Sequence, residues 1–524
     1  MTAVRNILFV MADQLRADYL SCYGHPFLET PAIDGLADRG VRFENAFVQS
    51  PVCGPSRMSF YTGRYMTSHG ATWNNVPLAA GTWTLGDHLR PLGLRVALAG
   101  KTHMAADRAG LARLGVAPDS REGVLAAECG FEPFVREDGL CPDVGLDPGA
   151  AYNAYLRSRG YGGNNPWHEW ANSGEGPDGE VLSGWRLRNS VHPARVREED
   201  SETAWITDRA IDFIEAQGEE RWCLHLSYIK PHWPYVAPAP YHALYGRNQV
   251  LPAVRHPAEL DDPHPVYGAF LRHEESRSFQ RDEVRQAVIP AYMGLVRQID
   301  DHLARLFAVL ERTGRMADTM IVVTSDHGDY LGDHWLGEKE LFHEASLRIP
   351  LIVYDPDPAA DATRGTVERR LIESIDLAPT FVEAAGGEPP RHVLEGRSLL
   401  PLIRGRTRPE WRDAVFSELD YGFRQARLDL GLGVDEARAF MVRTERWKYV
   451  HYEGFRPQLF DLVDDPDELR DLGADPDRAA VRAELHERIF AWLRRRRIRT
   501  TMADETVERR TASAASRGIY IGVW

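Results

Sequence analysis

Cysteine is scarce in this sequence. The chain has 524 residues but only 5 cysteines, at positions 22, 53, 129, 141 and 223. So few thiols in so long a chain do not form the disulfide framework that stabilises small secreted domains. A cysteine in a distinctive local pattern is therefore a candidate for chemistry rather than for cross-linking.

Long apolar runs and excess positive charge are also missing. No stretch of about 18 apolar residues occurs, which argues against a membrane-spanning helix. The first residues, MTAVRNILFVMADQ, lack the longer apolar region and the cleavage site of a signal peptide. The net charge of −15 disfavours a general nucleic-acid or anionic-membrane binder. We therefore expect a cytoplasmic protein with neither nucleic acid nor membrane as a partner.

The length and the apolar patterning predict one large and one smaller domain, because 524 residues exceed the usual size of a single core. Continuous apolar runs are typical of strands buried on both faces of a parallel sheet. Such runs occupy residues 6–12, 94–99, 222–228, 319–324 and 351–354. Helical patterns occupy residues 30–40, 84–92, 203–217, 281–312 and 374–385, with Pro290 predicting a kink or break. This alternation predicts an α/β fold over residues 1–400, a doubly wound, mostly parallel sheet sandwiched by helices.

Three other segments differ from this pattern. Residues 105–199 lose their periodicity and are predicted to be a loop-rich insertion over the site. Residues 401–499 alternate as antiparallel strands do and close with a helix at 478–494, which predicts a small α+β domain. Residues 500–524 are predicted to be a C-terminal arm ending in the apolar GIYIGVW. We expect this arm to dock on another copy in a dimer or tetramer, with packing on its own chain as the alternative.

Polar residues follow directly after the predicted strands. In open α/β sheets, ligands bind beyond the carboxyl ends of the strands. The residues found there are Asp13 and Gln14, Lys101 and His103, His232, and Asp326 and His327, and Lys339 lies in a later loop. Each of them alone would also suit a helix cap or a solvated loop.

Four of these residues form a candidate cation site. Asp13, Gln14 and Asp326 offer side-chain oxygens and His327 offers an imidazole, so the set is rich in oxygen. Such a set favours Ca²⁺, Mg²⁺ or Mn²⁺ over zinc, and the imidazole favours Mn²⁺ slightly.

The stretch SPVCGPSRMSFYTGR, residues 50–64, is the most distinctive in the chain. It contains the pattern C-x-P-x-R, and we expect a turn at Pro55 followed by a helix beginning near Met58. A cysteine just before a helix faces unpaired N–H groups, which can also hold an anion. The simpler alternative is a small buried cysteine beside a turn.

The pattern C-G-P-S-R at residues 53–57, followed by T-G-R, resembles the signature of type I sulfatases of the alkaline phosphatase superfamily. G-K-x-H around Lys101 and His103 and K-P-H-x-P around His232 resemble motifs of the same family. The resemblance implies that a separate formylglycine-generating enzyme oxidises Cys53 to formylglycine, whose hydrated aldehyde is the nucleophile. It also implies one divalent cation, Ca²⁺ or Mn²⁺ with Mg²⁺ as a further candidate. The implied metal residues are Asp13, Gln14, Cys53, Asp326 and His327.

The resemblance further implies a set of catalytic residues. Arg57 would orient formylglycine, and Lys101, Lys339 and His232 would neutralise the transferred group. His232 or Lys339 would protonate the leaving oxygen. His103 would be the base that restores the aldehyde. The catalytic set is thus Cys53, Arg57, Lys101, His103, His232 and Lys339.

The substrate class remains open between two branches of the superfamily. Asp-Gln at residues 13–14 and Asp-His at 326–327 resemble phosphonate monoester hydrolases, whereas the pair Lys101 and His103 resembles sulfatases. We therefore expect a small anionic ester as substrate. A sulfate ester is preferred, as in arylsulfatases, with side activity on other esters. The alternative is a phosphonate monoester or phosphodiester hydrolase. A non-catalytic anion-binding scaffold is disfavoured because no residue of the set is missing.

Overall fold

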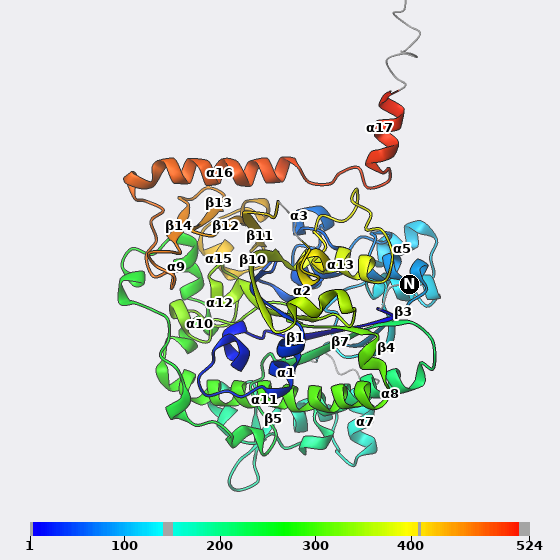
Figure 1. The fold of residues 1–524 in the computed structure, drawn as a ribbon. Helices are drawn as coiled ribbons and strands as arrows, with labels where there is room; N and C mark the ends of the chain where they lie inside the picture. The colour runs from blue at the N-terminus through cyan, green and yellow to red at the C-terminus, as the bar shows by residue number, and fades with distance from the viewer. Residues whose placement is uncertain (1–3, 140–149, 407–409, 513–524) are drawn as a thin grey trace, which may run out of the picture.

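The computed structural model describes residues 4–139, 150–406 and 410–512 (Figure 1). The predicted docking segment GIYIGVW lies outside the described residues.

An eight-stranded mixed sheet forms the centre of the molecule, with helices on both faces (Figure 1). The strand order is β10-β2-β9-β8-β1-β7-β3-β4. β9 pairs antiparallel with both of its neighbours, and every other pairing in the sheet is parallel. The strands are β1 (Asn6–Asp13), β2 (Val41–Phe47), β3 (Arg95–Gly100), β4 (Glu132–Arg136), β7 (Trp222–Pro231), β8 (Thr319–Ser325), β9 (Arg348–Tyr354) and β10 (Thr366–Glu373). The predicted α/β class with a mostly parallel sheet is confirmed.

The sequence of β1 is apolar throughout because both of its faces are covered. Ile7, Phe9 and Met11 belong to one hydrophobic core, and the alternating Leu8 and Val10 belong to the other. The first core contains side chains of α2 (Cys53–Thr62), α4 (Leu85–Leu89) and α13 (Leu377–Ala384). The second contains side chains of α1 (Pro31–Arg39), α8 (Glu202–Ala216) and α11 (Asp282–Arg312). Since side chains alternate along a strand, a two-sided core requires an unbroken apolar run.

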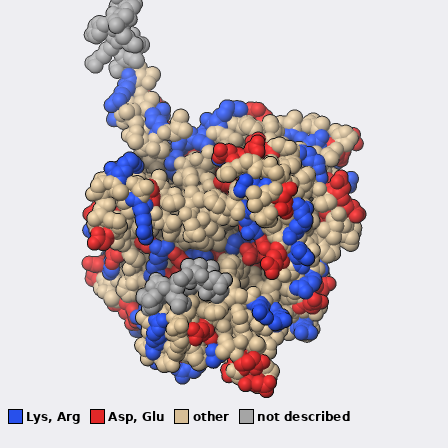
Figure 2. Space-filling model, turned by 180° about the vertical axis from the view of Figure 1, so that it is seen from behind, with Lys and Arg blue, Asp and Glu red and all other residues tan. Residues whose placement is uncertain are grey.

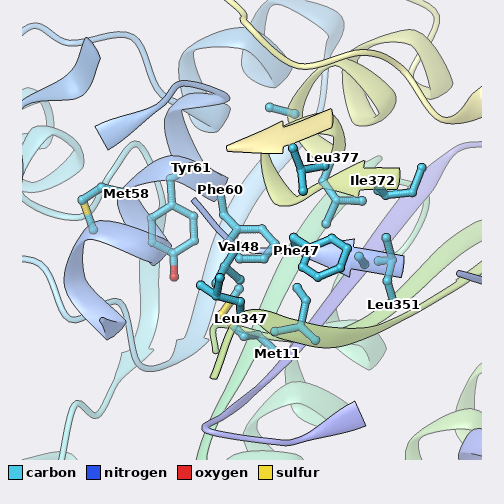
Figure 3. Close-up of a cluster of buried hydrophobic side chains, with 14 of the residues drawn as sticks. Met11, Phe47, Val48, Met58, Phe60, Tyr61, Leu347, Leu351, Ile372 and Leu377 are labelled. Atoms are coloured by element: carbon cyan, nitrogen blue, oxygen red, sulfur yellow. The ribbon is translucent and has the colours of Figure 1, made fainter. Parts of the chain in front are cut away.

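Figure 3 shows part of the first core, where Met11 of β1 and Phe47 of β2 lie near Phe60 of α2 and Leu377 of α13. Burial of side chains of this size contributes about 1.5–3 kcal/mol each. This packing fixes α2 against the sheet, which matters because α2 carries Cys53.

Of the predicted kink or break at Pro290, the break is wrong, because α11 continues through this residue from Asp282 to Arg312. Pro290 removes one backbone N–H from the helix. The residues on either side, Ile289 and Ala291, are both 1% exposed, so tertiary packing holds the helix together there.

A second sheet lies in the C-terminal part of the chain. β11 (Ala414–Asp420), β12 (Arg438–Thr444), β13 (Trp447–Tyr452) and β14 (Gln458–Asp461) pair antiparallel in chain order. α16 (Ala479–Arg494) packs Leu485 and Ile489 on this sheet. The predicted small antiparallel sheet with a helix is confirmed, whereas the domain boundary at 400/401 stays a prediction. α17 (Asp504–Ala512) projects away from the body of the molecule (Figure 1).

The sequence patterns did not predict β2, β4 or β10. β4 comes from the segment 105–199 and forms one edge of the large sheet, so part of that segment belongs to the core fold. The same segment contains α5 (Arg108–Leu114), α6 (Arg121–Ala127), α7 (Ala151–Ser158) and the hairpin of β5 (Ser173–Glu175) and β6 (Val181–Ser183). The rest of the segment stays a predicted insertion.

Charges of both signs are interspersed over the face of the molecule in Figure 2, without one dominant basic area. Within the described residues, every helix is too short or too polar to cross a lipid bilayer.

Candidate active site

Four neighbouring strands, β8, β1, β7 and β3, end at the same edge of the large sheet. Asp326 follows β8, Asp13 ends β1, His232 follows β7 and Lys101 follows β3. All four side chains are buried, with exposures from 0% for Asp13 and Asp326 to 8% for His232. Because these strands are parallel neighbours, residues far apart in the sequence converge on one place.

Helix α2 brings Cys53 and Arg57 to this edge. α2 begins at Cys53, five positions before the predicted start near Met58. Pro55 lies within its first turn, where a proline is tolerated because the N–H group it lacks would have no partner in the helix. Cys53 and Arg57 are four residues apart and therefore lie on one face of the helix. Gly63 ends α2 with a φ of 62°.

Arg57 connects the strand ends to one another. Its Nε donates to Asp326 Oδ2 at 2.7 Å, and its terminal nitrogens reach Asp13 Oδ2 at 3.3 Å and the Lys101 carbonyl at 2.9 Å. The residue is 0% exposed. Burial alone would lower the pKa of the guanidinium, but Asp326 and Asp13 raise it well above its usual value. A charged, fixed guanidinium therefore lies beside Cys53.

The donor atoms of Asp13, Cys53, Asp326 and His327 lie within 4.8 Å of one another. His327 Nδ1 lies 2.8 Å from the Gly328 carbonyl oxygen, so Nδ1 carries the proton and Nε2 offers its lone pair. Nε2 is 3.7 Å from Oδ1 of Asp13 and of Asp326. Burial would raise the pKa of Asp13, but Lys101, His232 and Arg57 hold it well below its usual range. An ionised carboxylate, a second carboxylate and an imidazole lone pair fit a divalent cation.

Gln14, the remaining predicted metal residue, lies beside this cluster with its backbone N–H donating to Asp326 Oδ1 at 3.0 Å. Its side-chain Oε1 accepts from Lys339 Nζ at 2.9 Å, and its Nε2 donates to Asp329 Oδ2 at 2.5 Å. These two contacts fix which way the amide points. An amide oxygen has a second lone pair, so Oε1 can also face a cation.

Lys101 and His103 lie on the other side of Asp13. Lys101 Nζ is 2.5 Å from Asp13 Oδ2, and this carboxylate raises the pKa of the ammonium although burial opposes the change. His103 has a φ of 55°, which non-glycine residues rarely adopt, and its N–H donates to Asp138. Burial and then Lys101 lower the pKa of His103, while its contact with Cys53 raises it slightly. Among the described residues, His103 Nδ1 has no hydrogen-bond partner.

His232 and Lys339 complete the predicted set. His232 Nδ1 lies 2.7 Å from the Trp233 carbonyl oxygen, which leaves Nε2 as an acceptor in the neutral ring. Burial, Lys339 and Lys101 lower the pKa of His232 well below its usual value. Burial would lower the pKa of Lys339, but Cys53 and Glu338 raise it. The site thus combines charged lysines with neutral histidines.

Several supporting residues were missed by the sequence analysis. Asp329 accepts from Gln14 and from the Tyr235 hydroxyl at 2.6 Å, Ser227 accepts from Arg57 at 2.8 Å, and Asp138 accepts from the His103 N–H at 3.1 Å. Asp329 and Tyr235 each lie three residues after a predicted site residue, Asp326 and His232. Their position next to those motifs was the available signal. Asp138 had no such signal.

Comparisons with known proteins identify the family of this chain. The family model described as "Sulfatase" matches residues 5–387, and the model "N-sulphoglucosamine sulphohydrolase, C-terminal" matches residues 332–495. The "Multifunctional alkaline phosphatase superfamily protein PehA" of Trinickia caryophylli is 33% identical, covering 96% of each chain. An arylsulfatase of Clostridium perfringens is 27% identical over 89% of this chain and 90% of its own. The solved phosphonate monoester hydrolase of Silicibacter pomeroyi has a TM-score of 0.83 and 30% identity over 94% of this chain and 96% of its own. The chain therefore belongs to the sulfatase family of the alkaline phosphatase superfamily and is a hydrolase of sulfate or phosphonate esters.

Proposed function

We propose that this enzyme hydrolyses sulfate esters of the arylsulfatase type, using formylglycine formed from Cys53 and one divalent cation. The observation that carries the choice of sulfate is the pair Lys101 and His103 on one side of the cluster. The buried ammonium of Lys101 forms an ion pair with Asp13. His103 is a neutral base near Cys53, and its Nδ1 has no hydrogen-bond partner among the described residues.

Asp13, Gln14, Asp326 and His327 would hold the cation. When bound, it supplies positive charge that lowers the pKa of the attacking hydroxyl and neutralises an oxygen of the ester. We assign Ca²⁺ or Mn²⁺ from the oxygen-rich donor set with one imidazole.

Binding of the anionic ester depends on the buried cations of the chain. Lys101 and Lys339 keep their protons because nearby carboxylates, Asp13 for Lys101 and Glu338 and Asp13 for Lys339, raise their pKa values. Arg57 is fixed by Asp326 and holds residue 53 in place. In a site shielded from water, such preorganised charges stabilise the transferred group more strongly than solvent would.

Two histidines handle the protons. The neutral His232 gains proton affinity when an anionic ester binds beside it, and it then protonates the leaving oxygen, assisted by Lys339. His103 accepts the proton whose removal restores the aldehyde at residue 53. Its lowered pKa keeps it in the basic form at neutral pH.

A second candidate activity is hydrolysis of phosphonate monoesters or phosphodiesters. It is favoured by the Asp-Gln and Asp-His pairs in the cluster and by the solved phosphonate monoester hydrolase, which is 30% identical. Sulfate monoesters and phosphonate monoesters each carry one negative charge, so hydrogen-bond geometry must separate them. We place this activity second.

The proposed partners follow from this chemistry. The substrate is a small anionic ester, and maturation requires a formylglycine-generating enzyme. A cytoplasmic location and a homo-oligomer formed through the C-terminal arm remain predictions.

The test is a panel of kcat/KM values for an aryl sulfate, a phosphonate monoester and a phosphodiester, measured on metal-loaded enzyme that carries formylglycine. We expect the aryl sulfate to be preferred. In the double variant Lys101→Tyr/His103→Thr the preference should move toward the phosphonate. A far higher kcat/KM for phosphonate in the wild-type enzyme would overturn the ranking.

A further inference from the structure

A separate cavity of about 340 Å³ lies beside the candidate active site. Its walls combine aromatic rings with carboxylates: Trp185, Trp233, Tyr235 and Phe279, and Glu274, Glu275 and Glu338. Among the described residues that line it, none is a lysine or an arginine. The charged side chains that line the cavity are therefore acidic, whereas Arg57, Lys101 and Lys339 in the active site are basic.

Trp233 is shared by the cavity and the active site. Its ring centroid lies 4.3 Å from that of His232 and 5.1 Å from that of Trp185. On the other wall, Glu338 directly precedes Lys339 in the chain. The cavity therefore begins next to the residues that would protonate the leaving oxygen.

The carboxylates of this region differ in how they are paired. Glu275 has an ion pair with Arg424, and the same arginine pairs with Glu340 at 2.9 Å. No side-chain hydrogen bond or ion pair joins Glu338 to another described residue, although the charges of Lys339 and Arg424 act on its carboxylate. Burial raises the pKa of Glu338, and a cation bound beside it would favour its charged form.

Aromatic faces and a carboxylate together select a particular kind of ligand. The faces of tryptophan and tyrosine attract organic cations through the ring quadrupole, and a nearby carboxylate adds a charge interaction. A quaternary alkylammonium group is weakly hydrated and apolar at its rim, so it suits an aromatic wall better than a metal ion does. A neutral group of the same shape would gain only the apolar contact.

We infer that this cavity binds the leaving-group end of the substrate and selects a leaving group that carries an organic cation, such as an alkylammonium. The inference rests on the proposed function only in placing the ester between Cys53 and His232. The substrate class would then be esters with an anionic reacting group and a cationic end, which match the two oppositely charged halves of the site.

The first experiment measures binding without catalysis. The dissociation constants of a trimethylammonium alcohol and its tert-butyl isostere are determined by calorimetry on the metal-loaded enzyme. We expect the cationic alcohol to bind about 10-fold more tightly. Glu338→Gln and Trp233→Leu should each reduce this ratio severalfold. The control Glu388→Gln removes an exposed carboxylate from a different cavity and should leave the ratio unchanged. Equal affinity for the two alcohols in the wild-type enzyme would overturn the inference.

The second experiment compares kcat/KM for the sulfate esters of the same two alcohols. A preference for the cationic ester that falls in Glu338→Gln supports the leaving-group assignment, and no preference contradicts it. If the enzyme prefers phosphonates, the proposed function fails, but the corresponding pair of phosphonate esters still tests the cavity. The two failures are therefore distinguishable.

Discussion

The Sγ atom of Cys53 lies 3.0 Å from Nε2 of His327, although 274 positions separate the two residues in the chain. His327 Nδ1 carries its proton toward the Gly328 carbonyl, so the thiol donates to Nε2. Conversion of Cys53 to formylglycine would remove this donor and free Nε2. Modification of residue 53 would therefore change the contact of a nitrogen atom that we propose as a cation ligand.

We predict that active enzyme carries formylglycine at residue 53. Mass spectrometry of the peptide spanning residues 52–57 should show the thiol replaced by an aldehyde. The Cys53→Ala variant should fold but lose activity, because it cannot form the nucleophile. Full activity in enzyme whose residue 53 is entirely unmodified cysteine would contradict the prediction.

Removal of Asp13 should abolish metal binding and activity. Asp13→Asn keeps the shape of the side chain, while Asp13→Ala also leaves Lys101 without its buried ion-pair partner, at a cost of about 3–5 kcal/mol. Both variants should lose the bound cation in elemental analysis. Asp178→Ala, at an exposed position, is the control and should retain it. Stoichiometric metal in Asp13→Asn would exclude this carboxylate as a ligand.

His103→Ala should slow the second half of the reaction more than the first. With an aryl sulfate, we expect a rapid burst of phenol followed by turnover that is slower by about 10²-fold or more. His192→Ala, outside the cluster, should show normal turnover. Equal slowing of the burst and the steady state would assign His103 to another role.

The pH profile of the wild-type enzyme tests the same residue. Burial and Lys101 lower the pKa of His103, so its basic form persists to a lower pH than for an ordinary histidine. Loss of the base on acidification should therefore occur below about pH 6.5, where a free histidine would titrate. If kcat falls on acidification already at or above that pH, and His103→Ala lacks this fall, the pKa of His103 is not lowered and the prediction is wrong.

His69 should make the fold less stable in acid. Burial, followed by Arg64, lowers its pKa from 6.5 to about 3. Below pH 6.5 the unfolded chain therefore binds one proton more than the folded chain, so stability falls as the pH falls toward 3. The loss is about 1.4 kcal/mol per pH unit. Denaturant unfolding of the wild type and His69→Asn between about pH 6 and 4 should show a shallower slope in the variant, and equal slopes would refute the assignment.

We predict that the C-terminal arm holds subunits together. α17 projects from the body in Figure 1 and the apolar GIYIGVW follows it. Deletion of residues 500–524 should lower the mass measured by light scattering, because an apolar end is stabilised when another copy covers it. A shorter deletion that removes only the apolar end, residues 518–524, separates its contribution from that of α17. An unchanged mass in both would favour packing of the arm on its own chain.

The sequence by itself determined the α/β class, the strand runs of the central sheet and the polar residues at their ends. β1, β3, β7 and β8 were predicted because a strand covered on both faces is apolar along its whole length. The C-x-P-x-R motif and the polar residues after each strand indicated the place of the chemistry. These signals are local, since each depends on a few neighbouring residues.

Only the tertiary structure decided the order β8-β1-β7-β3, which places the polar ends of these strands side by side. It also decided that β2, β4 and β10 are strands, that α2 begins at Cys53 and that α11 passes through Pro290. Pairing between distant segments and packing on a core override local preferences and have no periodic signature in the chain. The charge states of Lys101, His103 and His232 likewise depend on burial and on partners from other strands. These states arise only when the fold excludes water and brings opposite charges together.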